Sequence, residues 1–394
     1  MTTPQTPIIQ GWCPGALRPM QSGDGLVVRI RPRAGRLTSD QARGIASLSA
    51  QHGNGLIDLS NRANLQLRGV TEASHPALID GLRAVDLIDA DATDEARRNI
   101  IVSPFWTEGD GSQEIAAALA KALTASDAPN LPGKFGFSID LAKFSTIQTA
   151  SVDIRIEWHP SGWLVRGESF ITGAMIDTAK AAADAALELA RWFMDSGGVE
   201  AGRGRMARLW QNEPLNIRHD RLPLRFREGG GAMLGNASPP KPGTFAQGQL
   251  VGFEFGQMQA ETLAQLGDLG PLRLTPWRML LIESLTETPH IPGVITRPDD
   301  HMLRVIACTG APGCLQAHAA TRPLARALAP MLTETLHISG CAKGCAHPTA
   351  APLTLTATPS GFALIRGGTA SGTPLREGLS AADLTETNIL NEFP

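Results

Sequence analysis

Four of the five cysteines in this 394-residue chain form two close pairs in its last quarter. Cys308 and Cys314 are separated by five residues, and Cys341 and Cys345 by three. In a reducing compartment, close pairs within an odd total indicate a metal centre rather than disulfides. Structural zinc sites usually have tighter first pairs, whereas the separate iron corners of a cluster suit wider spacings. The spacing therefore favours an iron–sulfur cluster and leaves structural zinc as the alternative.

Glycines flank both cysteine pairs, at Gly310, Gly313, Gly340 and Gly344. A residue without a side chain lets the backbone approach a cluster and turn its N–H groups toward the sulfides. The glycines add weight to the cluster interpretation.

The overall composition excludes several classes of protein. The chain carries 35 Lys and Arg against 38 Asp and Glu, a net charge of −3, so no global attraction to nucleic acid or to an anionic membrane is expected. No run of about 18 apolar residues is present, and the amino terminus lacks the pattern of a secretion signal. We expect a soluble cytoplasmic protein of two or three domains, without nucleic acid or membrane as a partner.

The order of the elements expected from the sequence repeats once along the chain. The first copy has a strand at 26–31, a helix that begins with the capping box Thr38/Gln41 and ends near Gly53, and two strands at 56–59 and 65–70. The second copy has the same order, with its helix closed by Gly267, at 249–255, 258–266, 272–274 and 279–282. The repeat predicts a duplicated β-α-β-β unit whose copies pair about a pseudo-two-fold axis.

Further elements are expected between and after the two copies. The segment between them has predicted strands and a long helix, at 135–139, 152–158, 163–166 and 174–194. After the second copy, predicted strands each run into a cysteine and a hairpin completes the chain, at 303–307, 336–339, 353–357 and 362–365. The Gly- and Pro-rich stretch 229–243 is the predicted linker.

The cysteine motifs resemble those of the nitrite and sulfite reductase superfamily. They read Cys308-Thr-Gly-Ala-Pro-Gly-Cys314 and Ser339-Gly-Cys341-Ala-Lys-Gly-Cys345. The resemblance implies that these four cysteines hold a [4Fe–4S] cluster, and that the last one bridges to sirohaem where that tetrapyrrole is bound.

The same resemblance implies the fold class and the domain limits. The expected fold is α+β, with duplicated ferredoxin-like halves and two reductase-type α+β domains. We expect ferredoxin-like halves at 11–75 and 244–290, a first reductase-type domain at 76–228 and a cluster-binding domain at 291–394.

Basic and polar side chains on the predicted strands are candidates for binding the carboxylates of a tetrapyrrole. Arg29 and Arg31 share one strand face, and Gln66 and Arg68 another. By residue type alone, these could equally be two solvated faces. The segment Arg62-Ala-Asn-Leu-Gln66-Leu-Arg68 resembles the family strand that holds ring carboxylates, which implies that role for Arg62, Gln66 and Arg68.

Relatives that reduce small oxyanions line the distal face of the ring with two arginines and two lysines. The resemblance carries that set onto Arg31, onto Arg98 in Arg98-Asn99-Ile100, and onto Lys134. Gly136 replaces the second lysine of the family pattern. A small dianion needs concentrated positive charge, whereas the loss of a lysine leaves room for a larger organic substrate.

Three segments resemble the branch of the superfamily that acts in aerobic cobalamin biosynthesis. They are Gly11-Trp-Cys13-Pro-Gly15, Gly23-Asp24-Gly25-Leu26 and Gly340-Cys341-Ala-Lys-Gly-Cys345-Ala-His347-Pro348. The resemblance implies that the substrate is precorrin-3A, held where relatives keep sirohaem. It also implies O2-dependent hydroxylation at C20 with γ-lactone formation, and a non-haem iron besides the cluster.

The residues leave several roles open. His347 is a candidate ligand of the second iron, beside His301, His318 and His337, and Cys13 is either functional or simply packed. No dinucleotide-binding motif follows a predicted strand, so the electrons are expected from an external donor or reductase. The alternative functions are a sirohaem-dependent sulfite or nitrite reductase and a non-catalytic zinc-binding protein.

Overall fold

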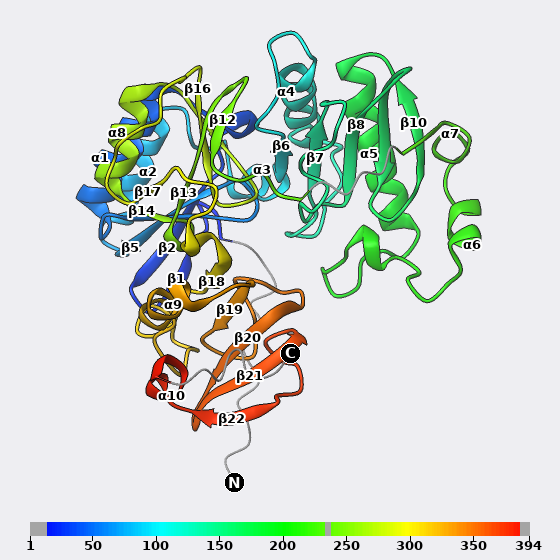
Figure 1. Cartoon of the computed structure of the whole chain (residues 1–394). Helices are drawn as coiled ribbons and strands as arrows, with labels where there is room; N and C mark the ends of the chain where they lie inside the picture. The colour runs from blue at the N-terminus through cyan, green and yellow to red at the C-terminus, as the bar shows by residue number, and fades with distance from the viewer. Residues whose placement is uncertain (1–13, 233–237, 387–394) are drawn as a thin grey trace.

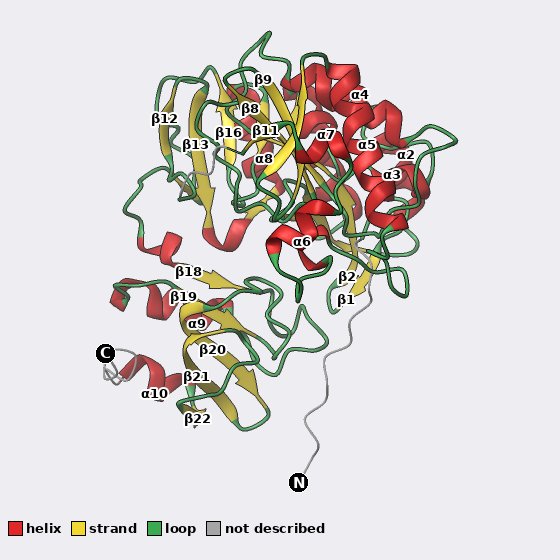
Figure 2. Cartoon of the chain, turned by 90° about the vertical axis from the view of Figure 1, so that its right-hand side faces the viewer, coloured by secondary structure: helices red, strands yellow, loops and turns green. Residues whose placement is uncertain are grey.

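Four β-sheets organise the chain in a computed structural model, which describes residues 14–232 and 238–386. In Figure 1 two small units lie together at the upper left, an α+β domain lies to their right, and a second α+β domain lies below. Figure 2 shows the lower domain set apart from the rest by loops. No helix within the described ranges is long and apolar enough to cross a membrane.

The first ferredoxin-like unit is a sheet covered by helices. Its own elements are β1 (Met20–Ser22), β2 (Gly25–Ile30), η1 (Arg33–Gly35), β3 (Arg36–Leu37), α1 (Ser39–His52), β4 (Leu56–Leu59), β5 (Leu65–Val70) and α2 (His75–Ala84). The predicted capping box is confirmed, because Gln41 N donates to Thr38 Oγ1 and Thr38 N donates to Gln41 Oε1. The helix ends with Gly53 as its cap, as predicted.

The second ferredoxin-like unit repeats this order of elements. It contains β12 (Gly243–Phe245), β13 (Gly248–Phe253), η3 (Glu254–Gly256), β14 (Gln257–Gln259), α8 (Ala260–Leu269), β15 (Leu272–Leu274), β16 (Leu280–Glu283) and β17 (Val294–Ile295). The prediction that Gly267 closes the helix is wrong, because α8 continues to Leu269 and ends at Gly270. A Cβ on Gly267 would lie 2.8 Å from that of Ala42, so this glycine instead permits close packing of α8 on α1.

The two units exchange one strand each. The sheet orders are β1-β2-β5-β4-β14 and β12-β13-β16-β15-β3, so each sheet ends on a short strand from the other unit. In each unit a residue at positive φ, Ala34 (50°) or Phe255 (58°), turns the chain toward the neighbouring sheet. One hydrophobic core, with Ile45 and Leu263 among its buried residues, is shared by both units.

The first α+β domain has a six-stranded sheet in the order β11-β10-β9-β8-β7-β6. Its strands are β6 (Ile100–Val102), β7 (Phe137–Asp140), β8 (Ile154–His159), β9 (Gly162–Gly167), β10 (Thr172–Ile176) and β11 (Gly230–Gly231). Its helices are α3 (Ala92–Arg97), α4 (Ser112–Leu123), α5 (Ala179–Asp195), η2 (Met206–Arg208), α6 (Leu215–Asp220) and α7 (Leu224–Arg227).

Two predictions for this domain need correction. The helix expected at 174–194 begins only at Ala179, because Ala174 pairs with Val165 as part of β10. The predicted linker at 229–243 contains β11, which pairs with β10, and its last residue is the first residue of β12. Residues 233–237 lie outside the described part of the chain.

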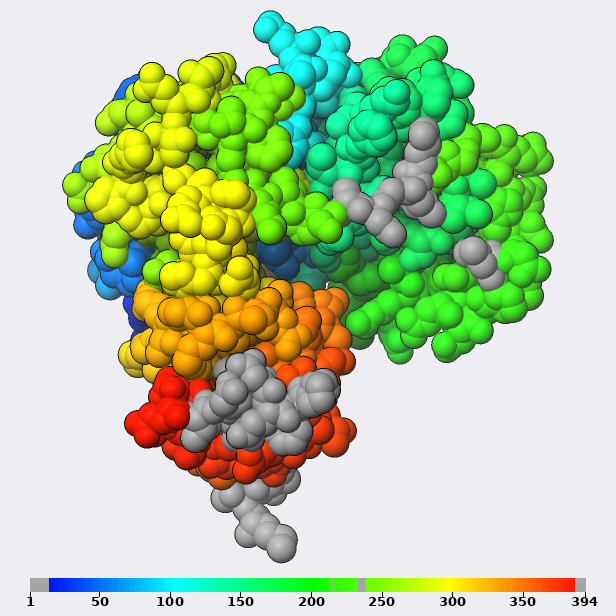
Figure 3. Space-filling model, in the orientation of Figure 1, coloured from blue at the N-terminus to red at the C-terminus, as the bar shows by residue number. Residues whose placement is uncertain are grey.

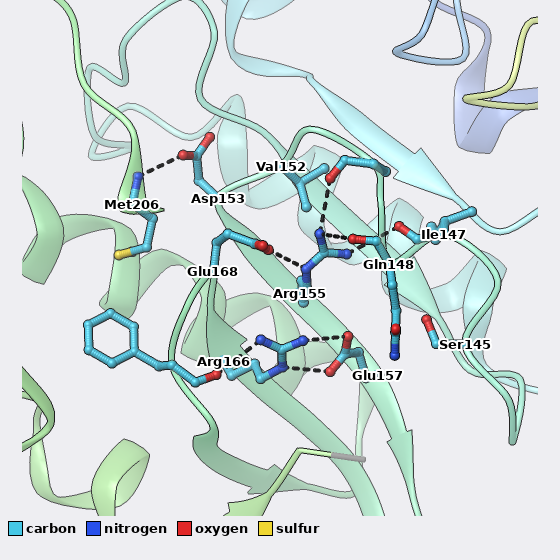
Figure 4. A network of polar contacts seen from close by, with 12 residues as sticks. Ser145, Ile147, Gln148, Val152, Asp153, Arg155, Glu157, Arg166, Glu168 and Met206 are labelled. Atoms are coloured by element: carbon cyan, nitrogen blue, oxygen red, sulfur yellow. Dashed lines mark hydrogen bonds and ion pairs between the residues drawn. The ribbon is translucent and has the colours of Figure 1, made fainter. Parts of the chain in front are cut away.

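A buried polar network reinforces the face of this sheet opposite the apolar core (Figure 4). Arg155 and Arg166 are cross-strand neighbours, and each is neutralised by its own carboxylate, Glu168 and Glu157 respectively. Arg155 also donates to the carbonyl oxygens of Ile147, Gln148 and Ala150. The network therefore fixes the loop that follows β7.

The second α+β domain has the same sequence of parallel and antiparallel pairs. Its elements are η4 (His301–Arg304), β18 (Val305–Ala307), α9 (Arg322–Leu328), η5 (Ala329–Met331), β19 (Leu336–Ser339), β20 (Ala351–Thr358), β21 (Gly361–Gly368), β22 (Arg376–Leu379) and α10 (Ala381–Glu386). β18, β19 and β20 run parallel, and β21 and β22 follow antiparallel, as do β6 to β10 in the first domain. The strand expected at 303–307 is shorter, because Leu303 and Arg304 lie in η4.

Candidate metal and tetrapyrrole site

The two cysteine loops leave adjacent parallel strands at the same edge of the sheet. Cys308 follows β18 and Cys341 follows β19, and these strands pair with Ala307 opposite Ile338. Carboxyl ends of parallel strands meet at one edge, which brings the loops into contact. Gly340 N donates to Cys308 Sγ at 3.1 Å, and His318 N donates to Gly340 O at 2.8 Å.

Gly340 is required where the loops meet. A Cβ on this residue would lie 2.7 Å from the Cβ of Ala317 and 3.5 Å from Cys308 Sγ. Any side chain would therefore push the first cysteine loop away from the second.

The four thiols act on one another electrostatically, and all are free of disulfides. Burial raises the pKa of Cys341, and Cys314 and Cys308 raise it further. Enclosure by protein likewise raises the pKa of Cys345, with Cys341, Cys308 and Cys314 adding to it, although part of Cys345 is exposed to solvent. Four neighbouring thiolates would repel one another, so a bound cation is needed to keep them deprotonated together.

Four thiols are a donor set that either a zinc ion or an iron–sulfur cluster uses. A single zinc needs its sulfurs converging at about 2.3 Å from one point. No three His, Cys, Asp or Glu side chains within residues 14–232 and 238–386 converge as ligands of one ion. In a cluster each thiolate binds a different iron, so two docked loops with two thiols each supply the number and type of ligands that such a cluster needs.

Each ferredoxin-like unit holds one cysteine loop. On the first loop, Gly313 O accepts hydrogen bonds from Ser22 Oγ (2.8 Å), Gly23 N (3.1 Å) and Arg68 Nη2 (3.3 Å). On the second, Ala346 O accepts one from Arg278 Nη2 at 2.9 Å. The cysteine loops are thus fixed from the side of the units as well as by each other.

The motif Gly23-Asp24-Gly25 supplies the first of these contacts. A Cβ on Gly23 would lie 2.3 Å from Pro312 O, and Asp24 accepts two hydrogen bonds from Arg68, at 2.6 and 3.0 Å. Arg68, predicted to hold a ring carboxylate, is therefore already engaged by a protein carboxylate and by the first cysteine loop. Its placement makes it a support for the loop.

Arg278 lies between the second unit and the cysteines. Burial lowers its pKa, Arg322 lowers it further, and Asp58 and Cys308 oppose the shift. The counterpart of Arg278 in the first unit is Ala63, because Ala63 follows Ser60 and Arg278 follows Thr275 at the same distance along the chain. Ala63 and Arg278 have φ of 52° and 60°, and hydroxyl groups at Ser60 and Thr275 organise the two turns.

A row of polar residues crosses the sheet of the first unit. Arg29, Gln66, Asp58 and Gln257 are successive cross-strand neighbours on β2, β5, β4 and β14. Arg29 donates twice to Gln66 Oε1, at 2.5 and 3.1 Å, and Gln257 Nε2 donates to Asp58 Oδ1 at 2.7 Å. The structure thus joins Arg29 and Gln66, which the sequence placed on two separate strands, into one polar row across the sheet.

Arg31, Arg98 and Asn99 are buried in the protein. Arg31 Nη2 donates to Pro14 O at 3.2 Å, and its Nη1 lies 3.4 Å from Glu95 Oε1. Arg98 makes two hydrogen bonds to Asp89, at 2.7 and 2.8 Å, and one to Arg31 O at 2.9 Å. Arg98 therefore binds the carboxylate of Asp89, whereas the resemblance implied that it binds the substrate. Asn99 Nδ2 donates to the backbone carbonyl oxygens of Ala96 and Phe135.

Arg62 and Lys134 meet at the boundary of the first unit and the first α+β domain. Arg62 Nη2 donates to Lys134 O at 3.0 Å, and Lys134 is exposed. A Cβ on Gly136 would lie 3.3 Å from Arg62 Nη1 and 3.2 Å from Asn99 O. A side chain at position 136 would therefore be in tight contact with Arg62 and Asn99, and a small shift of these neighbours would be needed to accept it.

Figure 3 shows a recess where the second unit and the two α+β domains meet, with blue atoms of the first unit at its floor. The cysteine-bearing domain forms its lower edge in this view.

Two of the four candidate histidines lie together. The ring centroids of His337 and His347 are 5.6 Å apart, whereas His301 and His318 are exposed at other positions. His337 is fully buried, and neither ring nitrogen has a hydrogen-bond partner in the described structure. Burial, with His347 and Arg278, lowers its pKa to about 4, so the ring is neutral. Cys13 lies outside the described residues.

Comparisons with known proteins agree with this geometry. Residues 18–85 match the model of the nitrite/sulfite reductase ferredoxin-like half domain. The ferredoxin–nitrite reductase of Synechococcus elongatus is 24% identical over 397 residues, covering 86% of this chain and 77% of the relative. The Mycobacterium tuberculosis NirA protein superimposes with a TM-score of 0.63 at 17% identity, over 92% of this chain and 79% of that one, which shows a shared fold.

The chain thus contains a ferredoxin-like half domain of the nitrite/sulfite reductase type and is similar to a nitrite reductase over most of its length. It is also similar along nearly its whole length to the precorrin-3B synthase of a Sinorhizobium species. The identity is 29% over 402 residues, covering 93% of this chain and 84% of the relative.

Proposed function

We propose that this chain is a precorrin-3B synthase of cobalamin biosynthesis. The observation that carries the proposal is its full-length similarity to a precorrin-3B synthase. The gathering of four free thiols on two docked loops supports it, because an oxidoreductase of this family needs an electron-carrying centre.

The proposed reaction is hydroxylation of precorrin-3A at C20, with the ring A acetate closing a γ-lactone. One oxygen atom of O2 enters the substrate and the other leaves as water, so two electrons and two protons must be supplied. We propose an external electron donor or reductase as their source. The substrate would lie in the recess of Figure 3, where relatives hold sirohaem.

The residues proposed to orient the substrate are Arg29, Arg31, Arg62, Gln66 and Lys134. Arg62 and Lys134 lie at a domain boundary, and Arg29 and Gln66 form one bonded pair in the polar row of the first unit's sheet. Cationic and amide donors of this kind bind carboxylates of a polyacidic ring. Arg68, Arg98 and Asn99 belong to the same proposed site as supports, because their donors are bonded to protein acceptors.

Cys308, Cys314, Cys341 and Cys345 are proposed as ligands of a [4Fe–4S] cluster. Such a cluster supplies one-electron transfer when bound. The chain's own contribution is to hold two loops together through Gly340 and to fix them from outside through Arg68 and Arg278.

A non-haem iron is proposed as a second metal, with His347 as a ligand. His337 joins it in this proposal, because a buried neutral imidazole with two unpartnered nitrogens fits metal ligation. The structure brings only this pair of the four candidate histidines together among the described residues.

The finer domain division is part of the same proposal. We propose that the two strand-exchanging units and the two α+β domains are the duplicated halves of one ancestral unit, with limits near 11–75, 76–228, 244–290 and 291–394. The equal orders of strands in the two halves support this.

A sirohaem-dependent nitrite or sulfite reductase is the second candidate function. The similarity to a ferredoxin–nitrite reductase over 86% of the chain favours it. The glycine at position 136 opposes it, because the second lysine that the oxyanion site of those relatives uses is missing from this chain.

One experiment separates these functions. The protein is purified without oxygen, its visible spectrum is recorded, and it is then given precorrin-3A, a chemical reductant and 18O2. We expect no sirohaem bands and a product that has gained one labelled oxygen by mass spectrometry. Sirohaem bands together with reduction of nitrite, and no labelled product, would overturn the proposal. Zinc without iron or sulfide would indicate the non-catalytic alternative.

A further inference from the structure

A cavity of about 630 Å³ lies between η1, α4 and the start of β6. In Figure 1 it is where the blue chain before α1 meets the cyan helix α4. Its wall is apolar, with Ala34, Ala117 and Ala120, and its rim carries Arg33, Arg36 and Lys121. Of the residues proposed to bind precorrin-3A, it shares only Arg98.

The duplicated fold provides an internal reference for this cavity. η1 and η3 occupy equivalent places, and their central residues, Ala34 and Phe255, have nearly equal φ of 50° and 58°. Phe255 is buried in the core of the second α+β domain, whereas Ala34 faces the cavity. The cavity therefore exists where the second half of the protein places a phenyl ring.

The helices beside these two turns, α4 and α9, also differ in the size of their side chains. The buried residues Ile115, Ala116 and Leu119 of α4 have the same spacing as Leu324, Ala325 and Leu328 of α9. This alignment places Gln113 opposite Arg322, and Ala117 opposite Arg326.

Both arginines of α9 lie over the Phe255 ring, at 5.6 and 5.2 Å from its centroid. In the first half, Ala34 stands in place of the phenylalanine, and the smaller residues Gln113 and Ala117 stand in place of the two arginines. Three coordinated replacements leave an open space instead of a repacked core, although empty apolar space is costly.

The groups around the cavity indicate an anionic ligand. Four cations line it, Arg33, Arg36, Arg98 and Lys121, against one carboxylate, Asp89. Arg98 and Arg36 are held by Asp89 and Glu283, and half-exposed Arg33 is paired with Asp86. Lys121 makes no ion pair within the described ranges. The Nε2 atom of Gln113 is buried without a hydrogen-bond partner in the described structure, so this N–H group could donate to an acceptor on a ligand.

We propose that this cavity binds a planar organic anion. Its ring would take the place that the Phe255 ring occupies in the other half, and its carboxylate would face Lys121 and Arg33. The volume is within the range of small-molecule sites. The proposal does not depend on the function proposed above, because it concerns a separate cavity and no redox chemistry.

The test is calorimetric titration of the cluster-loaded protein with 2-naphthoate. We expect binding that Ala34→Phe abolishes, because position 34 already has the backbone that Phe255 adopts. Lys121→Ala should weaken binding about tenfold, whereas Lys180→Ala, on the exposed face of α5, should leave it unchanged. The neutral analogue 2-naphthylmethanol should bind more weakly and should not respond to Lys121→Ala.

Absence of 2-naphthoate binding at millimolar concentration would overturn the proposal, as would equal binding by Ala34→Phe. If Ala34→Phe does not fold, Ala117→Arg fills the cavity with the residue found at the equivalent place on α9, and the same two outcomes apply. Turnover of precorrin-3A is a separate readout, so the failure of one proposal is distinguishable from the failure of the other.

Discussion

Arg278 donates a hydrogen bond at 2.9 Å to the carbonyl oxygen of Ala346, the residue that follows Cys345. Arg278 comes from the second ferredoxin-like unit and Cys345 from the second α+β domain, so the bond joins two separately organised parts of the chain. Its backbone has φ of 60°, which is uncommon for a residue with a side chain. A glycine would adopt this backbone conformation more readily, so we infer that an arginine is present at position 278 for the contact that its side chain makes.

Arg278→Met should loosen the second cysteine loop. Loss of a hydrogen bond from a charged group costs about 1.5–3 kcal/mol, and here it also frees a loop that carries two of the thiols. We expect the variant to lose iron and sulfide faster than the wild type after dilution into a chelator. The decay of the visible absorbance of the cluster measures the rate of this loss. Arg297→Met, at an exposed site whose partner is Asp299, is the matched control and should leave the rate unchanged.

Cys345→Ser should remove the cluster and the turnover together. A serine oxygen is a poor replacement for a thiolate on iron, and the other three thiols alone do not complete the ligand set. Iron and labile sulfide per chain should fall well below the wild-type values, whereas Cys13→Ser should retain them. Full iron and sulfide content in Cys345→Ser would contradict the assignment.

Arg62→Ala should weaken the binding of precorrin-3A. One charge-assisted bond contributes about 1.5–3 kcal/mol, which corresponds to roughly a tenfold to hundredfold rise in Kd. Equilibrium titration without oxygen measures this effect apart from chemistry. Arg83→Ala, which removes an exposed arginine paired with Asp80 on α2, serves as the control. Unchanged affinity in Arg62→Ala would show that the carboxylate-binding strand is misplaced.

Glu283 gives the stability of the joined units a pH dependence. Burial alone would raise its pKa, but hydrogen bonds from Arg36 and Arg273 outweigh burial and hold the pKa below 4.5. A carboxyl group whose pKa is lower in the folded than in the unfolded protein stabilises the fold when the pH is above its unfolded-state pKa. This stabilisation is lost as the pH falls through its folded-state pKa. Glu283→Gln should cost about 3 kcal/mol at neutral pH, because it leaves two arginines without their carboxylate.

The difference in Tm between wild type and Glu283→Gln should shrink as the pH falls below 4.5. Glu287→Gln, an exposed neighbour, should show no such convergence. A constant difference from pH 7 to pH 3 would contradict the assigned role of Glu283.

Local patterns predicted much of the regular structure. The strands at Leu56–Leu59, Leu65–Val70, Leu272–Leu274 and Leu336–Ser339 are confirmed to the residue, because alternating or continuous apolar runs set their limits. The capping box at Thr38 is likewise confirmed, since its two side chains are local to one turn.

The features that the sequence did not predict depend on distant partners. β3 and β14 are two and three residues long, and each pairs with a strand of the other unit, so no periodicity marks them. Arg68 and Arg98 have the same residue type as a substrate-binding arginine, and only the fold shows Asp24 and Asp89 beside them. The Gly-Asp-Gly pattern predicts a turn, but it does not predict that Gly23 lies close to Pro312, which is far away in the sequence.

The strand exchange has a consequence for how the protein is made. The sheet of the first unit ends on β14, so its edge strand β4 lacks a neighbour until the ribosome has produced Gln259. An exposed sheet edge attracts other chains, and chaperones commonly shield such surfaces during synthesis. Cutting the gene between the two units would leave each product with an open edge, so we expect neither piece to fold well in the absence of the other.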